Sequence, residues 1–189
     1  AYWSTDGGAF SPGSDGEPWF LEGDFDRGVE DPGYRELFVR WMQFAALLPM
    51  MRAHGTGTPR EIWQFGEAGE PFYDAIEKAI RLRYRLVPCL YSLMAETHFC
   101  GIPMLRHPAL VYGQDPALRH VNDQMLLGDG LLVKPVVRPV LYLPEGKPLP
   151  VYDDTEAVLL PAGHDWYELH TGKRFHGGQT VLTHAPLDV

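Results

Sequence analysis

The spacing of apolar residues changes near Gly101, and this change constrains the fold more than any other feature. Before it, apolar residues recur every three or four positions, which is the period of an amphipathic helix. After it come short runs rich in β-branched and aromatic residues, separated by turn residues and typical of strands. The sequence therefore predicts an α/β first half and an all-β second half, with the boundary between Gly101 and Arg106.

A first helix is predicted to begin at Pro32. Asp31 is a good N-cap residue, proline is favoured at the first helical position, and apolar residues then follow at helical spacing until Pro49. The preceding stretch, 11–31, is rich in glycine, proline and acidic residues and is predicted to be a long loop, of the kind that often serves as a functional lid.

A second and longer helix is predicted from Pro71 to about His98. Pro88 lies inside it, and we expect a kink there rather than two separate helices. The polar face of this helix carries acid–base pairs four residues apart, a spacing that stabilises helices. These pairs are Asp74 with Lys78 and Glu77 with Arg81.

Polar residues follow two predicted strands. Residues 1–10 are predicted to form a short strand that runs into a glycine-rich turn, with Asp6 where the strand ends, and His54 follows a short strand over 50–53. Each is followed by a predicted helix, so the two fit consecutive β/α units whose loops meet at one end of a parallel sheet or barrel, where active sites lie. A carboxylate and an imidazole there can hydrogen-bond sugar hydroxyls, and Trp3 or Phe10 can stack on a sugar ring.

The second half has many short apolar runs and several turn signals. His170–Lys173 is predicted to be a hairpin turn, and Glu145–Asp154 a surface insertion. The predicted strands are 104–105, 109–112, 124–127, 131–137, 140–143, 158–160, 166–169 and 179–183.

Composition excludes several classes of function. Sixteen basic and 25 acidic residues give a net charge of −9, which repels a phosphate backbone, so no nucleic-acid partner is expected. There is no apolar run long enough for a membrane helix and no HExxH or CxxC spacing, so we expect no membrane, metal or cofactor. Cys89 and Cys100 are 11 positions apart on one predicted helix, too far to pair, and are expected to be buried.

Both ends of the chain are interpreted as cuts. The chain opens inside an apolar stretch at 1–3 and stops at 187–189, where a strand is predicted to be under way. We therefore expect a missing N-terminal half of the same protein as a partner. A cut barrel exposes sheet edges and apolar helix faces, so self-association is also expected.

Blocks of sequence stand out along nearly the whole chain. They are Tyr2–Phe10, Tyr34–Phe44, Arg52–Gly55, Pro59–Gly66, Arg81–Pro88, Gln124–Asp129 with Leu131–Val133, and Leu160–Gly163 leading to Trp166–Gly172. In content and order they resemble glycoside hydrolase family 31, the retaining α-glucosidases and α-xylosidases, in which the first block reads W-x-x-D-I-G-G-F. Gly7 and Ala9 stand where that family more often has Ile and Gly, which leaves the geometry of this turn open.

This resemblance implies a fold of two parts. Residues 1–102 correspond to the C-terminal segment of a TIM (β/α)8 catalytic barrel, about its seventh and eighth units. Residues 103–189 correspond to the β-sandwich domain that follows the barrel, and whether it is complete at its end is left open. A whole barrel needs about 250 residues, so most of the barrel lies outside this chain.

The resemblance also implies the chemistry. It indicates an exo-acting enzyme that releases a non-reducing-end α-linked glucose or xylose from an oligosaccharide or glycoside. Retaining hydrolysis needs two carboxyl groups about 5 to 5.5 Å apart, and in this family both lie upstream of residue 1, so no catalytic residue is expected here. Asp6 and His54 are expected to bind sugar hydroxyls, Trp3 and Phe10 to line that site or fill the core, and Arg52 to be an ion-pair partner.

Two alternatives stay open. One is a non-catalytic carbohydrate-binding or interaction module formed by residues 103–189, whose ligand contacts would centre on Trp166 or Tyr167, although we expect both to lie in the core. The other is a cut barrel kept only as a scaffold. Between xylose and glucose, residues 26–28 followed by 34–36 favour an α-xylosidase-like relative.

Overall fold

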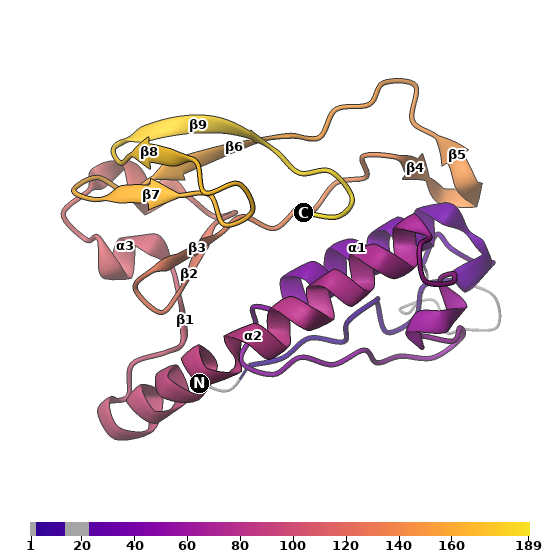
Figure 1. The fold of residues 1–189 in the computed structure, drawn as a ribbon, viewed down its shortest axis with the longest axis horizontal. Coiled ribbons are helices and arrows are strands. Elements are labelled where there is room, and N and C mark those ends of the chain that lie inside the picture. The colour runs from indigo at the N-terminus through magenta and orange to yellow at the C-terminus, as the bar shows by residue number, and fades with distance from the viewer. Residues whose placement is uncertain (1–2, 14–22) are drawn as a thin grey trace.

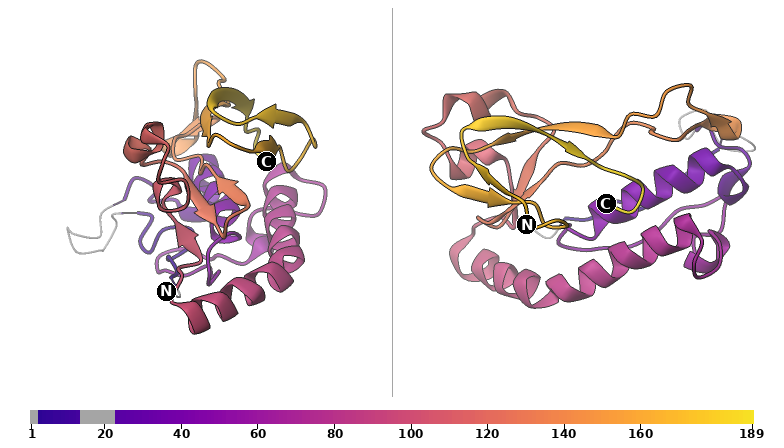
Figure 2. Two further views of the ribbon diagram at one scale, coloured as in Figure 1. Left: turned by 90° about the vertical axis from the view of Figure 1, so that its left-hand side faces the viewer. Right: turned by 45° about the horizontal axis from the view of Figure 1, so that its top comes forward.

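The computed structural model describes residues 3–13 and 23–189, and Figure 1 shows them as two long helices below a layer of short strands. Helices α1 (Pro32–Ala45) and α2 (Pro71–Cys100) account for most of the helical residues. The turned views in Figure 2 show the same two layers. The remaining helical segments are short: η2 (Gly28–Glu30), η3 (Ile62–Gln64), α3 (Pro108–Val111), η4 (Pro116–His120) and η5 (Pro144–Gly146).

Helix α1 begins as predicted. The Asp31 carboxylate accepts a hydrogen bond from the Gly33 backbone N–H at 2.8 Å, and Pro32 occupies the first turn, where its missing N–H costs nothing. The helix ends at Ala45, four residues before Pro49, because the chain tightens into turns over 46–50.

Helix α2 is one helix rather than two, as predicted, with Pro88 inside it, while the kink expected at Pro88 stays a prediction. The helix ends at Cys100, where Gly101 adopts a left-handed conformation with φ +71°. Its two polar pairs behave differently. Arg81 binds Glu77, whereas Lys78 binds Asp188, at the far end of the chain, at 2.9 Å. Cys89 and Cys100 are unpaired, as expected, but exposed rather than buried.

The two helices lie side by side and point in the same direction. The Arg35 guanidinium near the start of α1 lies 6.0 Å from the centre of the Phe72 ring at the start of α2. Arg83, farther along α2, donates to the Ala46 and Pro49 carbonyls just beyond the end of α1. Between the helices lies an apolar cluster of buried side chains: Tyr34, Phe38, Val39, Met42, Phe65, Ala75, Ile76 and Ala79.

The strands form small antiparallel sheets. The order β1–β2–β3 makes one sheet, and β4–β5, β6–β9 and β7–β8 make three pairs. A second apolar cluster joins the first of these sheets to α2 through Leu90, Met104, Leu127 and Val133. The strands are β1 (Leu105–Arg106), β2 (Met125–Leu127), β3 (Leu131–Val133), β4 (Tyr142–Leu143), β5 (Lys147–Pro148), β6 (Thr155–Leu160), β7 (Asp165–Tyr167), β8 (Arg174–His176) and β9 (Gln179–His184).

The sequence prediction is wrong in several details of this region. Residues 109–112 were expected to form a strand, but Pro108–Val111 is a helical turn with His107 as its N-cap, so the second half is not all β. Pro116 starts another helical turn behind the N-cap Asp115. Both are proline-led turns, in which the fixed φ of proline outweighs the β propensity of the residues around it.

Among the described residues there is no closed barrel. The strands expected over 1–10 and 50–53 reduce, in the described residues, to one parallel bridge between Gly7 and Ala53. Part of the predicted loop over 11–31 lies outside the described residues, at 14–22. No helix in the described part of the chain is both long and apolar enough to span a bilayer.

Two buried charged residues of α1 attach the strand layer to the helices. The Glu36 carboxylate accepts hydrogen bonds from the backbone N–H groups of Val140, Leu141 and Tyr142 at 2.8 to 3.2 Å. One turn later, Arg40 donates to the carbonyls of the last residues of the chain, Ala185, Pro186 and Val189. Except for Tyr142 of β4, the residues of these backbone groups lie outside the strands, so the two side chains supply hydrogen bonds that the strand pairs do not.

Candidate functional site

The two segments that carry Asp6 and His54 lie side by side and run in parallel. Three backbone hydrogen bonds join them: Met50 N–H to the Trp3 carbonyl at 3.2 Å, His54 N–H to Gly7 at 3.2 Å, and Thr56 N–H to Phe10 at 2.7 Å. Helix α1 connects the two segments, so this is a β/α/β arrangement of the kind the sequence predicts. The loops after both segments therefore meet at one edge.

Helix α1 fixes the turn after Asp6. A Cβ on Gly8 would overlap the Phe38 ring, and one on Gly7 would overlap the Arg52 carbonyl, so both positions need glycine. The Tyr34 hydroxyl of α1 donates to the Gly8 carbonyl at 2.8 Å, and burial raises the pKa of this hydroxyl to about 12. The turn is thus packed onto the apolar core rather than left free.

Asp6 is paired with Arg52 of the neighbouring segment. The two side chains form an ion pair, in which the Arg52 Nη2 donates to the Asp6 Oδ1. The Asp6 side chain is one-third exposed and that of Arg52 about half exposed. One oxygen of the carboxylate is therefore bound to a cationic donor, which orients the group. Arg52 is thus in an ion pair, as the sequence suggested, and its partner is the candidate site residue Asp6.

The aromatic residues divide between two places. The Phe10 ring lies against the His54 ring, with their centres 5.7 Å apart, and 42% of Phe10 is exposed. Trp3 is half exposed, and its ring packs edge-on against Phe44 of α1, with centres 6.2 Å apart. The structure therefore brings Asp6 and Arg52 together and Phe10 and His54 together, while the Trp3 ring packs against α1.

One residue at this edge was not singled out by the sequence. Arg60 follows the His54 loop, and its guanidinium donates to backbone carbonyls of both loops, Ala9 at 2.6 Å and Thr58 at 2.8 Å among them. The only signal in the sequence is that Arg60 lies within the block 59–66 of the family resemblance. A single arginine in a loop does not reveal that it contacts carbonyls fifty positions away.

The backbone conformation of Ala9 shows the geometry of the turn after Asp6, which the departure from the family pattern left open. It has φ +63°, in the left-handed region that residues with a Cβ rarely adopt, directly after Gly8 at φ +88°. The turn therefore keeps a conformation suited to glycine although alanine stands there.

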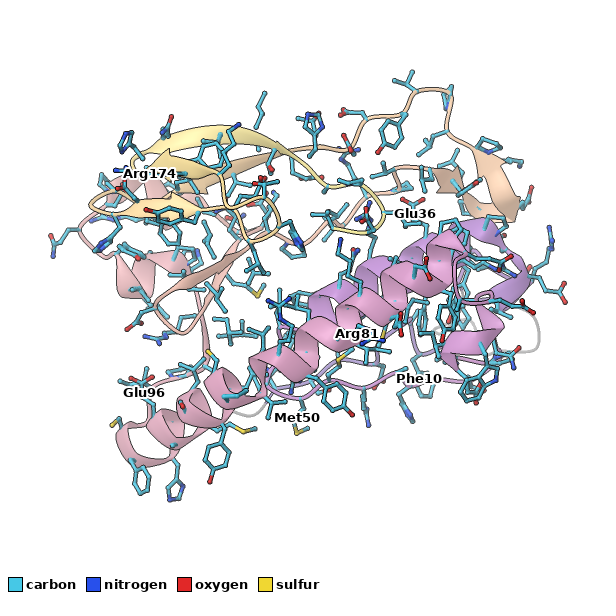
Figure 3. The ribbon with its side chains drawn as sticks, in the orientation of Figure 1. Phe10, Glu36, Met50, Arg81, Glu96 and Arg174 are labelled. Carbon is cyan, nitrogen blue, oxygen red and sulfur yellow. The ribbon has the colours of Figure 1, made fainter. Side chains whose placement is uncertain are left out.

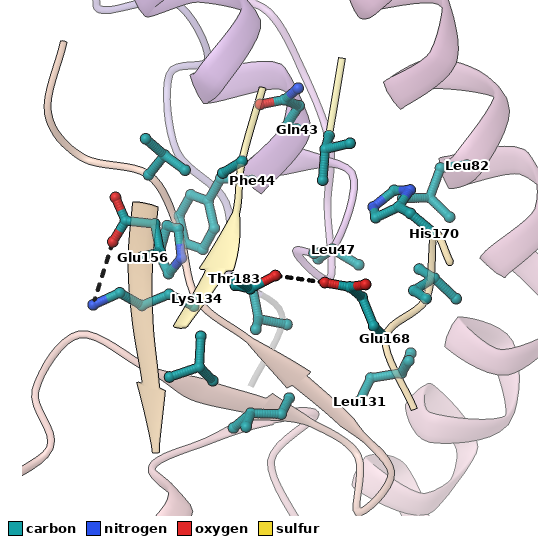
Figure 4. A pocket seen from close by; sticks show the side chains of 18 of the residues that line it. Gln43, Phe44, Leu47, Leu82, Leu131, Lys134, Glu156, Glu168, His170 and Thr183 are labelled. Carbon is teal, nitrogen blue, oxygen red and sulfur yellow. Dashed lines mark hydrogen bonds and ion pairs between the residues drawn. The ribbon is translucent and has the colours of Figure 1, made fainter. Parts of the chain in front are cut away.

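A large cavity among the described residues lies away from this edge. It measures about 1700 Å³ and lies between the two helices and the strand layer, as Figure 4 shows. None of Asp6, His54, Trp3 and Phe10 lines it. One of the acids that line it, Glu168, accepts hydrogen bonds from Thr171 and Thr183, which lower its pKa. This cavity therefore presents a carboxylate that the chain itself already satisfies.

The two aromatic residues of the binding-module alternative differ in exposure. Trp166 is partly buried and donates its indole N–H to the Pro161 carbonyl at 3.0 Å. Tyr167 is 65% exposed, so its expected place in the core is wrong. Among the described residues, no group of three or more His, Cys, Asp or Glu side chains is arranged to hold a metal ion.

Comparison with known proteins identifies relatives over the whole chain. The profile of the glycosyl hydrolases family 31 TIM-barrel domain matches residues 1–93, and that of the family 31 C-terminal domain matches residues 101–189. An alpha-xylosidase from Saccharolobus solfataricus is 31% identical over 187 residues, covering 99% of this chain and 22% of that protein. Neutral alpha-glucosidase AB from Sus scrofa is 36% identical over 154 residues, covering 77% and 14%.

Solved structures of xylosidases superpose on most of this chain. The family 31 alpha-xylosidase from Xanthomonas citri superposes with a TM-score of 0.73 at 38% identity, over 84% of this chain and 16% of that one. The xylosidase from Aspergillus niger superposes with a TM-score of 0.78 at 28% identity, over 99% and 26%. The chain thus spans about a quarter or less of the length of each of these relatives.

Proposed function

The chain belongs to family 31 of the glycosyl hydrolases, and on this premise we propose that it is part of a longer, exo-acting retaining α-glycosidase. Residues 1–102 supply the C-terminal segment of its catalytic barrel, about units seven and eight, and residues 103–189 supply the adjoining β-sandwich domain. Two findings support this division: two family profiles match in succession, and the chain spans about a fifth of the Saccharolobus solfataricus relative.

In this proposal Asp6 and His54 bind hydroxyls of the sugar at the non-reducing end. The main observation in support is that the loops of these two residues meet at one edge. Arg52 orients Asp6 there, and the His54 ring lies against the exposed Phe10 ring. Phe10 offers an apolar surface to the sugar ring. Trp3 lines the approach from the side of α1, where its exposed half faces outward.

The chemistry itself is assigned to residues outside this chain. Retaining hydrolysis passes through an oxocarbenium-like state between a nucleophilic carboxylate and an acid–base carboxyl group, and both are proposed to lie upstream of residue 1. Hydrogen bonds from Asp6 and His54 contribute to the rate when they strengthen as the sugar ring flattens. The ion pair with Arg52 orients the Asp6 carboxylate for this role.

For the sugar, we favour an α-linked xylose over an α-linked glucose. Relatives named alpha-xylosidase match 99% of this chain in one case and 84% in another, and the block 26–28 resembles that branch of the family. The glucosidase matches cover a smaller share, 77% for the Sus scrofa protein.

The test is hydrolysis of p-nitrophenyl α-xyloside and α-glucoside by the full-length protein and by Asp6→Ala and His54→Ala. Each substitution is expected to lower kcat/KM at least tenfold, which corresponds to about 1.4 kcal/mol of transition-state binding. The matched controls are Glu77→Ala, an exposed ion-paired acid on α2, and His98→Ala, an exposed histidine on the same helix, both expected to stay within twofold of wild type.

Other outcomes would change the proposal. Turnover by the 189-residue chain alone would place the two catalytic carboxylates within it. If Asp6→Ala and His54→Ala matched their controls, while sugar binding was lost on substitution of the exposed Tyr167, the binding-module alternative would be favoured.

We also propose that the 189-residue chain self-associates when it is made alone. Helix α2 exposes an apolar stripe at helical spacing, with Tyr84 and Tyr91 both 75% exposed and Val87 48% exposed between them. Patches of this kind on an otherwise acidic surface are typical of contact faces.

A further inference from the structure

Two loops must be held in register for Asp6, Phe10 and His54 to act on one ligand. Their backbones are joined by few hydrogen bonds, because the segments form only one bridge, at Gly7 and Ala53, before they separate. Beyond the bridge, a single backbone hydrogen bond, from the Thr56 N–H to the Phe10 carbonyl, joins the described parts of these loops. Some other group must therefore fix the loops relative to each other.

Arg60 contacts both loops at once. Its Nη2 donates to the carbonyls of Ala9 at 2.6 Å and Phe10 at 3.3 Å on the Asp6 side, and to Thr56 at 3.2 Å on the His54 side. Its Nη1 donates to Thr58 at 2.8 Å. A planar guanidinium with five fixed N–H donors can hold several carbonyls in one geometry, which the single point charge of lysine cannot do.

Two residues next to the Arg60 guanidinium, Gly55 and Ala9, have a size or a backbone conformation that permits this contact. A Cβ on Gly55 would overlap the Arg60 guanidinium and the carbonyls of Ala9 and Phe10, so this glycine makes room for the contact. Ala9, whose carbonyl accepts from Arg60, is one of two residues other than glycine with positive φ among the described residues. Unfavourable backbone conformations of this kind persist where the surroundings fix them.

We infer that Arg60 is the positioning residue of this site: by binding the carbonyls of residues 9, 10, 56 and 58, it fixes the loop of Asp6 and Phe10 against the loop of His54. This inference rests on the proposed function for its catalytic consequence, because the two loops carry the proposed sugar-binding residues. The consequence for the loops themselves follows from the contacts alone.

The first experiment measures hydrogen exchange in the full-length protein for wild type, Arg60→Ala and Arg60→Lys. Arg60→Ala is expected to speed exchange at least tenfold in peptides covering 3–12 and 50–59 together, while α1 and α2 keep wild-type protection. Arg60→Lys is expected to fall between the two, and the control Arg81→Ala, an exposed arginine bound only to Glu77, to match wild type. Unchanged exchange in either loop overturns the inference.

The second experiment separates positioning from a general loss of stability. At a temperature at which all variants are folded, Arg60→Ala is expected to lower kcat at least tenfold and to change KM less than threefold, with partial rescue in Arg60→Lys, since small displacements of binding groups cost most in the transition state. A kcat within twofold of wild type overturns the positioning role. If the wild-type protein hydrolyses neither glycoside, the proposed function fails, and the exchange experiment still decides whether Arg60 holds the loops.

Discussion

The contact between Glu36 and the segment 140–142 permits the sharpest stability prediction. Only 2% of Glu36 is exposed, and its two oxygens receive four hydrogen bonds from three backbone N–H groups. Figure 3 shows this residue on the side of α1 that faces the strands, whereas Phe10 lies on the opposite side of the helices. Substituting Glu36 therefore tests the junction of the two layers without touching the proposed sugar site.

The magnitude follows from which hydrogen bonds are lost. In Glu36→Gln the amide keeps one oxygen, which can still serve Leu141 and one neighbour, but its NH2 group faces the N–H of either Val140 or Tyr142. One buried donor then lacks an acceptor, which costs about 2 kcal/mol. Glu36→Ala removes the acceptors of all three donors and is expected to cost about 4 kcal/mol.

Thermal and urea unfolding followed by circular dichroism measure this effect. For a chain of this length, about 1 kcal/mol corresponds to roughly 2 to 4 °C in Tm, so Glu36→Gln is expected to lower Tm by roughly 4 to 8 °C and Glu36→Ala by about twice that. The control is Glu77→Gln on the exposed face of α2, expected within about 0.5 kcal/mol of wild type. If Glu36→Gln is as stable as this control, the buried carboxylate does not stabilise the junction and the reasoning is wrong.

Three further changes test other features. Ala9→Gly is expected to raise the free energy of unfolding by roughly 1 kcal/mol in urea titrations, since Ala9 has φ +63°, and no gain would mean that this turn is not strained. Hydrogen bonds from His184 and Tyr152 hold the pKa of Asp154 below its usual value. The unfolded state therefore binds this proton more tightly than the folded state. The stabilisation that ionised Asp154 gives the folded state is full above about pH 4 and is lost as the pH falls through the folded pKa. The Tm difference between wild type and Asp154→Asn should therefore shrink in this acid range, and a difference that grows there contradicts the assignment. Replacing Tyr84 and Tyr91 together by Lys should shift the isolated chain toward monomer in analytical ultracentrifugation, and an unchanged distribution excludes this stripe as the contact.

Much of the first half could be predicted from sequence because its signals are local. The N-cap pair Asp31 and Pro32, the long apolar period of α2 and its continuity through Pro88 depend on neighbours within a few positions, and the structure confirms all three. The family, too, could be identified from ordered blocks of residues. The adjacency of the Asp6 and His54 loops followed from the β/α order, which requires neighbouring parallel segments.

The errors arise where local signals compete with the fold. Residues 109–112 have strand-forming side chains, but Pro108 and the His107 cap favour a helical turn. Lys78 has a suitable acid four residues away, yet it binds Asp188, because the chain end lies against α2 in the folded molecule. Tyr167 belongs to an apolar run, but its strand β7 pairs only with β8 and leaves that face exposed.

Local patterns in the amino-acid sequence were enough to predict the helices, the change to short strands after Gly101, the family resemblance and the residues at the two loop ends. How those residues are held became visible only in the folded molecule. Folding paired Asp6 with Arg52, set Phe10 against His54, and brought Arg60 to carbonyls some fifty positions away in the chain. The physical reason is the distance along the chain over which each interaction acts. Helix caps and apolar periods act over a few residues, so a short stretch of sequence predicts them. A hydrogen bond between distant segments exists only after folding has brought its donor and acceptor together.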